Sequence, residues 1–212
     1  MDSSDPASQK GKGKVEAGCA PRRKPRILVA ACGSTGAVYF GNICRSFLEW
    51  AEVKAVATES TSHFTLATPE GVSLFLDEDE WKTWKRLGDS VLHIELLRWA
   101  DIMVIAPLSA NTLAKIAGGL CDNLLTCIVR GWDYSKPLFV APSMNSVMWR
   151  HPFTERQCIG IDELGISLIP PVIHTARSGS KLCSMAEPST ILSTVRDYYE
   201  LKMKQKNDSR QF

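Results

Sequence analysis

The feature that most constrains the fold of this chain is an alternation of short, unbroken apolar runs with longer amphipathic stretches between residues 25 and 200. The clearest runs are ILVAAC at 27–32, DIMVIAP at 101–107 and PLFVAP at 137–142. Runs without polar alternation are typical of strands buried on both faces. Shorter strands are expected at 53–57, 72–76 and 166–169. The pattern predicts an α/β fold with a doubly wound parallel sheet, a flavodoxin-like or Rossmann-like three-layer sandwich.

Helices are expected between these strands, and the polar ends of the chain are expected to lie outside the fold. We predict one folded domain over 25–200, a disordered N-terminal arm over 1–24 and a flexible C-terminal tail over 201–212. Asp89 or Ser90 is the expected cap of one helix. The helical segments are predicted at 37–50, 77–84, 89–99, 109–116, 124–129, 145–149, 154–164 and 189–201.

Composition excludes several classes of protein. A formal net charge of +2 gives no case for nucleic-acid binding. The chain contains no run of about 18 apolar residues, so no membrane span is predicted. The seven cysteines lack C-x-x-C spacing, so we expect no metal site and interpret most of them as buried free thiols in a reducing compartment. Without a secretory signal, the cytoplasm is the expected location. The basic cluster at 22–26 is also compatible with a nuclear address.

Polar loops follow three of the predicted buried strands: Gly33-Ser34-Thr35-Gly36, Ser109-Ala110-Asn111-Thr112 and Ser143-Met144-Asn145. Each has a purely structural alternative, namely a tight turn or a helix cap. Because parallel strands end at one edge of the sheet, the three loops together predict a single polar pocket. The first loop is neither G-x-G-x-x-G nor a P-loop. The pocket suits a monophosphate attached to a flat ring, which favours FMN over a dinucleotide.

Five segments carry a resemblance to a known family. They are GS at 33–34, VLHIELLRWAD at 91–101, APLSANTLAKIAGGLCDNLLTCIVR at 106–130, KPLFVAPSMNSVMW at 136–149 and MAEP at 185–188. In these segments the chain resembles the phosphopantothenoylcysteine decarboxylases, in the form of the plant halotolerance flavoproteins. These belong to the homo-oligomeric flavin-containing cysteine decarboxylases. The resemblance extends from about residue 24 to about residue 199.

The resemblance implies an FMN site and a trimer with FMN and substrate at the subunit interfaces. The tryptophans Trp81, Trp84, Trp99, Trp132 and Trp149 are expected in the core or at that interface. The implied FMN-binding residues are Gly33, Ser34, Thr35, Thr58, Glu59, Ser60, Ser109, Ala110, Asn111, Thr112 and Ser143.

The implied reaction is the oxidative decarboxylation of 4′-phosphopantothenoylcysteine to 4′-phosphopantetheine, on the route to coenzyme A. Flavin oxidises the cysteinyl side chain to a thioaldehyde, CO₂ leaves, and the electrons return to the enethiolate. His93 matches the catalytic histidine of the family. Asn145 matches a substrate-binding asparagine, and Arg98 matches an arginine suited to the substrate carboxylate. The alternative for Arg98 is a surface pair with Glu95.

One segment departs from the family pattern. The family carries a flap, Ala-Cys-Gly-Asp-Tyr-Gly-Asn-Gly, whose cysteine protonates the enethiolate. Arg177 stands at the cysteine position here, and Cys183 follows six residues later. An arginine cannot donate a proton at neutral pH. Two hypotheses follow: a decarboxylase with altered flap chemistry that uses Cys183, or a catalytically incomplete FMN-binding subunit. The incomplete subunit would act in a mixed trimer with a paralogue or as a regulatory protein.

Overall fold

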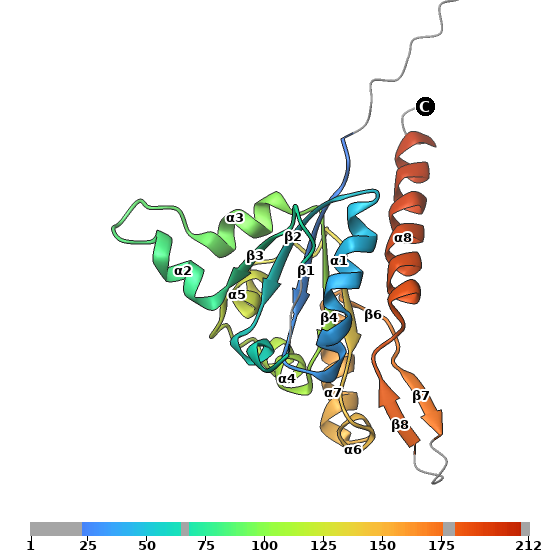
Figure 1. Cartoon of the computed structure of the whole chain (residues 1–212). Coiled ribbons are helices and arrows are strands. Elements are labelled where there is room, and N and C mark those ends of the chain that lie inside the picture. Colours follow the sequence, from blue (N-terminus) through green and yellow to red (C-terminus); the bar gives the residue numbers. More distant parts are fainter. Residues whose placement is uncertain (1–22, 65–67, 176–180, 209–212) are drawn as a thin grey trace, which may run out of the picture.

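The computed structural model describes residues 23–64, 68–175 and 181–208. Most of the predicted N-terminal arm, as well as Arg177 and Cys19, lies outside these ranges. A six-stranded sheet forms the centre of the molecule (Figure 1). Its strands are β1 (Arg26–Ala31), β2 (Glu52–Ala57), β3 (Ser73–Leu76), β4 (Ile102–Leu108), β5 (Leu138–Pro142) and β6 (Ser167–Leu168).

Every pairing in this sheet is parallel, and the strand order is β3-β2-β1-β4-β5-β6. The prediction of a doubly wound sheet is therefore confirmed, and the order is the Rossmann type of the two doubly wound arrangements. The chain builds outward from β1 in one direction and then restarts at β4 on the other side. The crevice between β1 and β4 is the position at which such sheets bind ligands.

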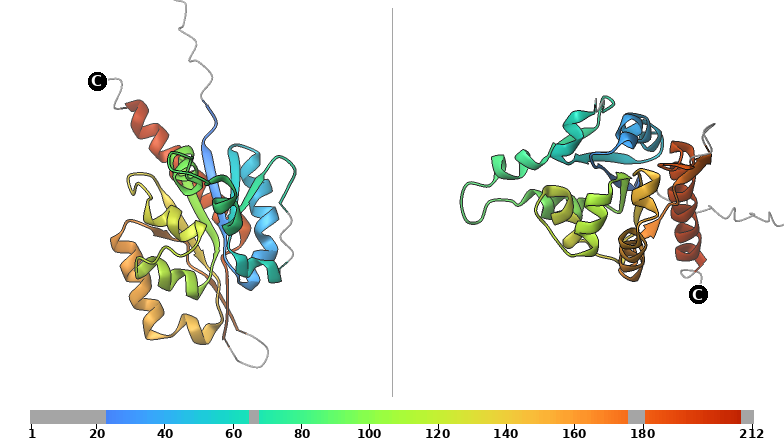
Figure 2. Two further views of the ribbon diagram at one scale, coloured as in Figure 1. Left: turned by 90° about the vertical axis from the view of Figure 1, so that its left-hand side faces the viewer. Right: turned by 90° about the horizontal axis from the view of Figure 1, so that it is seen from below.

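Helices cover both faces of the sheet (Figures 1 and 2). One face packs against α1 (Phe40–Leu48) and α8 (Pro188–Asp208) through a cluster that includes Val29, Phe47 and Ile191. The opposite face packs against α3 (Leu92–Trp99), α4 (Ala110–Ala117), α5 (Leu124–Arg130) and α7 (Pro152–Glu163). Alternate residues of β1 point to the two clusters, which explains why the run at 27–32 is apolar without interruption.

The remaining elements lie around the edges of the sheet. They are the 3-10 helices η1 (Thr35–Tyr39) and η2 (Glu59–His63), the helices α2 (Asp77–Thr83) and α6 (Ser146–Trp149), and the antiparallel hairpin of β7 (Val172–Thr175) with β8 (Lys181–Ser184). Among the described residues, no helix is both long enough and apolar enough to span a membrane.

Several sequence expectations differ from the structure. The hairpin β7–β8 was not predicted, because its residues show no clear alternation. The expected helix at 37–50 begins with a 3-10 turn. Neither Asp89 nor Ser90 caps α3, which begins after Val91; Asp89 instead accepts hydrogen bonds from the backbone N–H groups of Lys85 and Arg86.

The C-terminal helix is longer than predicted. We expected the chain to become flexible from about residue 201, but α8 continues to Asp208. Its aromatic residues explain this, because Tyr198 packs edge-on against Phe139 and Tyr199 packs against Trp50. The helix is therefore anchored to the domain just before its polar last turns.

The cysteines only partly follow expectation. In the described part of the chain they are free, but only Cys32 and Cys44 are buried. Cys121 is exposed, and Cys127, Cys158 and Cys183 are partly buried. The expectation that most of them are buried was wrong, because several lie on helices and in a hairpin at the edge of the core.

Candidate functional site at the carboxyl ends of the strands

A cavity of about 580 Å³ lies where β1, β4 and β5 end. Its size suits a small organic ligand. Residues from all three polar loops that the sequence predicted to meet line this cavity. The lining residues are Gly33, Ser34, Thr35, Ser60, Phe64, Ser109, Ala110, Asn111, Ser143, Met144, Asn145, Ser146, Met148 and Cys183.

Two serines join the first and third loops. The Ser34 hydroxyl lies 2.9 Å from the carbonyl oxygen of Ser143 and 2.6 Å from its hydroxyl. Both contacts are satisfied when Ser34 donates to the carbonyl and Ser143 donates to Ser34. Ser143 is 3% exposed, so the loop after β5 is held firmly against the loop after β1.

The first loop also depends on two glycines that allow close approach. A Cβ atom on Gly33 would lie 2.7 Å from the backbone oxygen of Ser60, whose hydroxyl accepts a hydrogen bond from Gly33 N. A Cβ atom on Gly36 would lie 3.0 Å from the Ser143 hydroxyl and 3.1 Å from Pro107 Cβ. Glycine at these positions therefore lets three segments converge at one edge of the cavity.

The second loop places a helix N-terminus at the cavity. Ser109 caps α4 by accepting a hydrogen bond from Thr112 N at 3.2 Å. The N–H groups of Ala110 and Asn111 have no acceptor in the described part of the chain, as is usual for the first turn of a helix. Two backbone donors and the positive end of the helix dipole are thus available to an anion.

Asn145 combines a structural role with exposure at the cavity. Its Oδ1 atom accepts hydrogen bonds from the N–H groups of Val147 and Met148, so it caps α6. The Nδ2 amide makes no hydrogen bond to any residue that the structure describes and can donate to a ligand. The cap predicted from the sequence and the proposed binding role therefore use different atoms of one side chain.

The residues predicted to bind FMN do not all line the cavity. Thr58 is buried behind it and lies 2.9 Å from the Ser60 hydroxyl, while Thr112 is buried in the first turn of α4. Glu59 is exposed and donates its backbone N–H to Asp77. The other eight line the cavity: Gly33, Ser34, Thr35, Ser60, Ser109, Ala110, Asn111 and Ser143.

His93 and Arg98 lie on α3, away from this cavity, and neither belongs to its described lining. His93 Nδ1 is 2.5 Å from an oxygen of Glu80 on α2. Arg98 is exposed, and the surface pair with Glu95 does not form; Glu95 instead accepts a hydrogen bond from Ser90.

Cys183 is the residue that sequence reasoning could not place. The unpredicted hairpin carries it to the cavity, where burial raises the pKa of its thiol. A raised pKa keeps the sulfur protonated at neutral pH, which is the state that a proton donor requires. No local sequence signal indicated this position, because it depends on how the hairpin folds over the ends of the strands.

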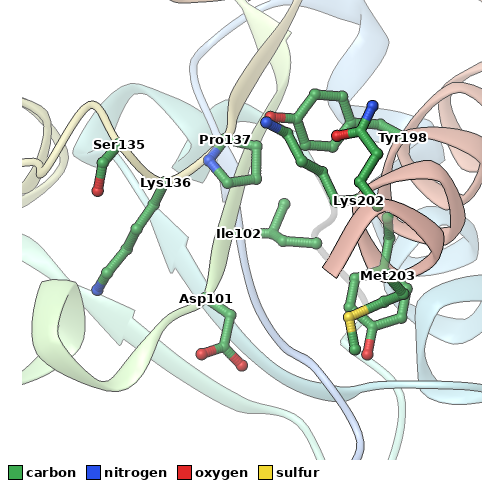
Figure 3. Close-up of a pocket in the computed structure, with 10 residues that line it drawn as sticks. Asp101, Ile102, Ser135, Lys136, Pro137, Tyr198, Lys202 and Met203 are labelled. Carbon is green, nitrogen blue, oxygen red and sulfur yellow. The ribbon is translucent and has the colours of Figure 1, made fainter. Parts of the chain in front are cut away.

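A second cavity, of about 470 Å³, lies at the opposite edge of the sheet (Figure 3). Ile102 and Pro137 come from the starts of β4 and β5, and Tyr198, Lys202 and Met203 come from α8. Parallel α/β sheets bind ligands at the carboxyl ends of their strands. The first cavity is therefore the candidate functional site.

The fold and the site define a doubly wound α/β protein with a neutral, donor-rich pocket at the switch point between β1 and β4. The model of the family described as Flavoprotein matches residues 19–200. The chain therefore belongs to the Flavoprotein family.

Individual relatives agree with this assignment. The chain is 62% identical over 210 residues to "Phosphopantothenoylcysteine decarboxylase HAL3a" from Glycine max, covering 98% of this chain and 99% of that protein. It is 45% identical over 177 residues to the phosphopantothenoylcysteine decarboxylase of Mus musculus, covering 82% and 87% of the two chains.

Solved structures give the same result. A PPC decarboxylase mutant complexed with pantothenoylaminoethenethiol aligns with a TM-score of 0.80 and 63% identity, over 84% of this chain and all of that one. "The FMN binding protein AtHal3" aligns with a TM-score of 0.80 and 62% identity, over 84% and 98% of the two chains. The resemblance expected from the sequence motifs is confirmed.

Proposed function

We propose that this chain is an FMN-dependent phosphopantothenoylcysteine decarboxylase that converts 4′-phosphopantothenoylcysteine to 4′-phosphopantetheine and CO₂ in the synthesis of coenzyme A. The observation that carries the proposal is the cavity at the switch point, whose polar loops contain the motifs shared with the family. Relatives that are 62% identical over nearly the whole chain are named for this activity.

The residues around the cavity fit FMN. No residue in the described lining carries a formal charge, so an anionic phosphate is held by neutral donors and a helix N-terminus. Ser34, Ser109 and the N–H groups of Ala110 and Asn111 supply such donors. Phe64, Met144 and Met148 supply apolar surface for a flat ring. Bound FMN supplies the two-electron redox couple that the reaction requires.

The protein's own residues bind the substrate and move protons. Asn145 Nδ2 donates to the substrate carboxylate or amide, and Arg98 is available to pair with the carboxylate because it has no ion-pair partner in the described part of the chain. His93 acts on the cysteinyl end of the substrate as a base or as a hydrogen-bond partner. Cys183 Sγ, held protonated in the cavity, donates the proton that completes the product.

A homotrimer explains how His93 reaches the substrate. His93 is not in the lining of its own chain's cavity, so an adjacent subunit must bring its α3 to that cavity. Exposed apolar side chains are available for such an interface, including Val38, Tyr39 and Trp81, which are 60%, 47% and 74% exposed. Large exposed apolar side chains are typical of surfaces that are covered in an assembly.

The assembly and its location follow from the same features. A mixed trimer with a paralogue remains the alternative, because Arg177 stands at the flap-cysteine position. The presence of Cys183 at the cavity favours the complete enzyme. The free thiols in the described part of the chain support a reducing compartment, and we place the protein in the cytoplasm.

The direct test is to purify the chain alone and incubate it with 4′-phosphopantothenoylcysteine. We expect yellow protein with one FMN per chain and mass-spectrometric detection of 4′-phosphopantetheine and CO₂. Colourless protein that does not bind added FMN would contradict the proposal. Release of CO₂ without 4′-phosphopantetheine would instead support the incomplete subunit.

A further inference from the structure

We propose that Glu80 is a positioning residue for His93: its carboxylate accepts a hydrogen bond from Nδ1–H and thereby presents Nε2 to the substrate. This inference rests on the proposed function, because it assumes that His93 acts in the decarboxylation. It assigns a role to a residue on α2, an element that contributes nothing to the described lining of the cavity.

The contact itself joins two helices. His93 Nδ1 lies 2.5 Å from Glu80 Oε1, across the junction of α2 and α3. The histidine side chain is 25% exposed and the glutamate side chain 14% exposed, so solvent competes weakly for either group. Glu80 is the only described residue that bonds to the imidazole ring. The ring orientation therefore depends on this one carboxylate.

The carboxylate also fixes which nitrogen is free for chemistry. An ionised carboxylate only accepts hydrogen bonds, so the neutral imidazole must carry its proton on Nδ1. The lone pair then resides on Nε2, which can accept a proton from the substrate or donate one after protonation. Without Glu80 the ring could rotate and exchange tautomers, and only part of the population would be competent.

A neighbouring cysteine helps to locate the Glu80 carboxylate among the helices. Burial, followed by the negative charge of Glu80, raises the pKa of Cys127 on α5 to about 11. The three helices α2, α3 and α5 pack together, so the carboxylate lies at their junction and not on the open face of α2. The alternative role for Glu80 is a first-turn acid that favours the helix dipole.

The position of α2 is itself firmly set. Asp77, its first residue, accepts hydrogen bonds from Glu59 N at 3.1 Å and from Leu124 N at 3.0 Å. Asp79 accepts a hydrogen bond from Leu76 N at 2.8 Å. These contacts tie α2 to η2 and to the start of α5, which keeps Glu80 directed towards α3.

The test compares Glu80→Gln with Glu78→Gln in the complete FMN-loaded protein. Glu78 is the matched control, because it lies on the same helix but is 81% exposed, and its ion pair in the described part of the chain is with Lys82. A glutamine at 80 can either donate to Nδ1 or accept from it, so it no longer selects one tautomer of His93. Loss of a carboxylate that orients a catalytic imidazole can cost up to about 10⁴-fold in kcat. For this partly exposed pair we expect kcat to fall by about 100-fold, with KM changed less than about threefold.

A double substitution separates positioning from a merely structural effect. In a His93→Asn background, Glu80→Gln should lower the residual rate no further, whereas a structural role would lower it again. The ¹⁵N chemical shifts of His93 should show the Nδ1–H tautomer in the parent protein and a mixture in Glu80→Gln. FMN content and melting temperature should match those of Glu78→Gln.

The outcomes distinguish this inference from the proposed function. If the parent protein turns over and His93→Asn does not, but Glu80→Gln is fully active, the positioning role is wrong and the decarboxylase assignment stands. If the parent protein binds FMN but never converts the substrate, the proposed function fails. The ¹⁵N shifts then still test whether Glu80 fixes the tautomer, since that measurement needs no turnover.

Discussion

At the scale of single residues, the site depends on where small side chains and thiols are placed. Gly33 and Gly36 allow the loop after β1 to touch segments from β2, β4 and β5. Cys183 reaches the same cavity from the hairpin. The glycines act by allowing close approach, whereas the cysteine is proposed to donate a proton, so substitutions at the two kinds of position should have different effects.

Substitution of Gly33 or Gly36 by alanine should damage the cavity, and Gly33→Ala should be the more severe. Its Cβ would meet backbone, which cannot rotate away, whereas the Cβ on Gly36 would meet side-chain atoms. Overpacking of this kind costs about 1–3 kcal/mol, and FMN affinity should fall with it. Gly160→Ala is the control: it lies in α7, and among the described residues its Cβ would meet Ala117 alone, at 4.0 Å. This substitution should stabilise the protein by about 1 kcal/mol. Urea unfolding and flavin fluorescence measure both effects.

Cys183→Ser should stop the final protonation without preventing the loss of CO₂. We expect CO₂ to form while 4′-phosphopantetheine falls by on the order of 10²-fold or more, because a positioned proton donor contributes at least that much. Cys158→Ser is the matched control, since its thiol is also partly buried with a raised pKa but lies outside the cavity lining. Mass spectrometry of the products measures both effects. Unchanged turnover in Cys183→Ser would exclude Cys183 as the proton donor.

At the scale of elements, single carboxylates tie together segments that are distant in the sequence. Asp77 joins α2 to η2 and α5, and Asp101 joins the start of β4 to the start of β1. In both cases an acid at the start of an element accepts hydrogen bonds from another element. The two carboxylates should therefore stabilise contacts between elements, which helix and strand propensities do not measure.

Asp77→Ala should destabilise the protein by about 1–3 kcal/mol, because it leaves two backbone donors without their acceptor. Glu78→Ala, one residue further along and highly exposed, should change stability by less than about 0.5 kcal/mol. Urea denaturation with and without FMN measures both. Equal stability of the two variants would show that α2 is held by packing alone.

Asp101 should make stability depend on pH in the acid range. Burial opposes its ionisation, but hydrogen bonds from Arg23 and from Arg26 N outweigh burial and hold the pKa of the carboxyl below its ordinary value of 3.8. A lowered pKa contributes stability that is present above the ordinary value and is lost as the pH falls through the folded-state value. We therefore expect Asp101→Asn to be less stable than the parent protein at pH 7. Between pH 5 and pH 2, the melting temperature of the variant should fall by less than that of the parent protein.

At the scale of the whole molecule, the cavity and the histidine proposed to act in it belong to different parts of one chain. The cavity lies at the switch point, whereas α2 projects beyond β3 and α3 packs on one face of the sheet (Figure 1). In the homotrimer that we propose, each subunit would present α3 to its neighbour and so bring the two together. Closed symmetric assembly then completes every site with the same contact.

Subunit mixing tests this arrangement. His93→Asn and Asn145→Asp should each inactivate a pure trimer, but trimers assembled from both chains should regain activity at sites that combine an intact cavity with an intact histidine. Sedimentation should give three times the chain mass. If mixed trimers stay inactive while both variants bind FMN, then each chain uses its own His93.

The sequence by itself determined the layers of the fold and most of the cavity. The runs that became β1, β4 and β5 are apolar on both faces, which is typical of a parallel sheet with helices on both sides. The carboxyl ends of parallel strands lie at one edge of the sheet. The loops containing Ser34, Ser109 and Asn145 were therefore expected to meet, and the neighbouring positions of β1, β4 and β5 in the sheet bring them together. These inferences needed only local pattern and the geometry of a sheet.

Only the tertiary structure decided which side chains came together from unrelated segments. The approach of Cys183 to the cavity, the pairing of Glu80 with His93 and the extension of α8 to Asp208 have no periodic signal in the chain. Each results from packing between elements that are far apart in sequence or at the edge of the sheet. Such contacts depend on the relative placement of whole elements, which residue spacing does not encode.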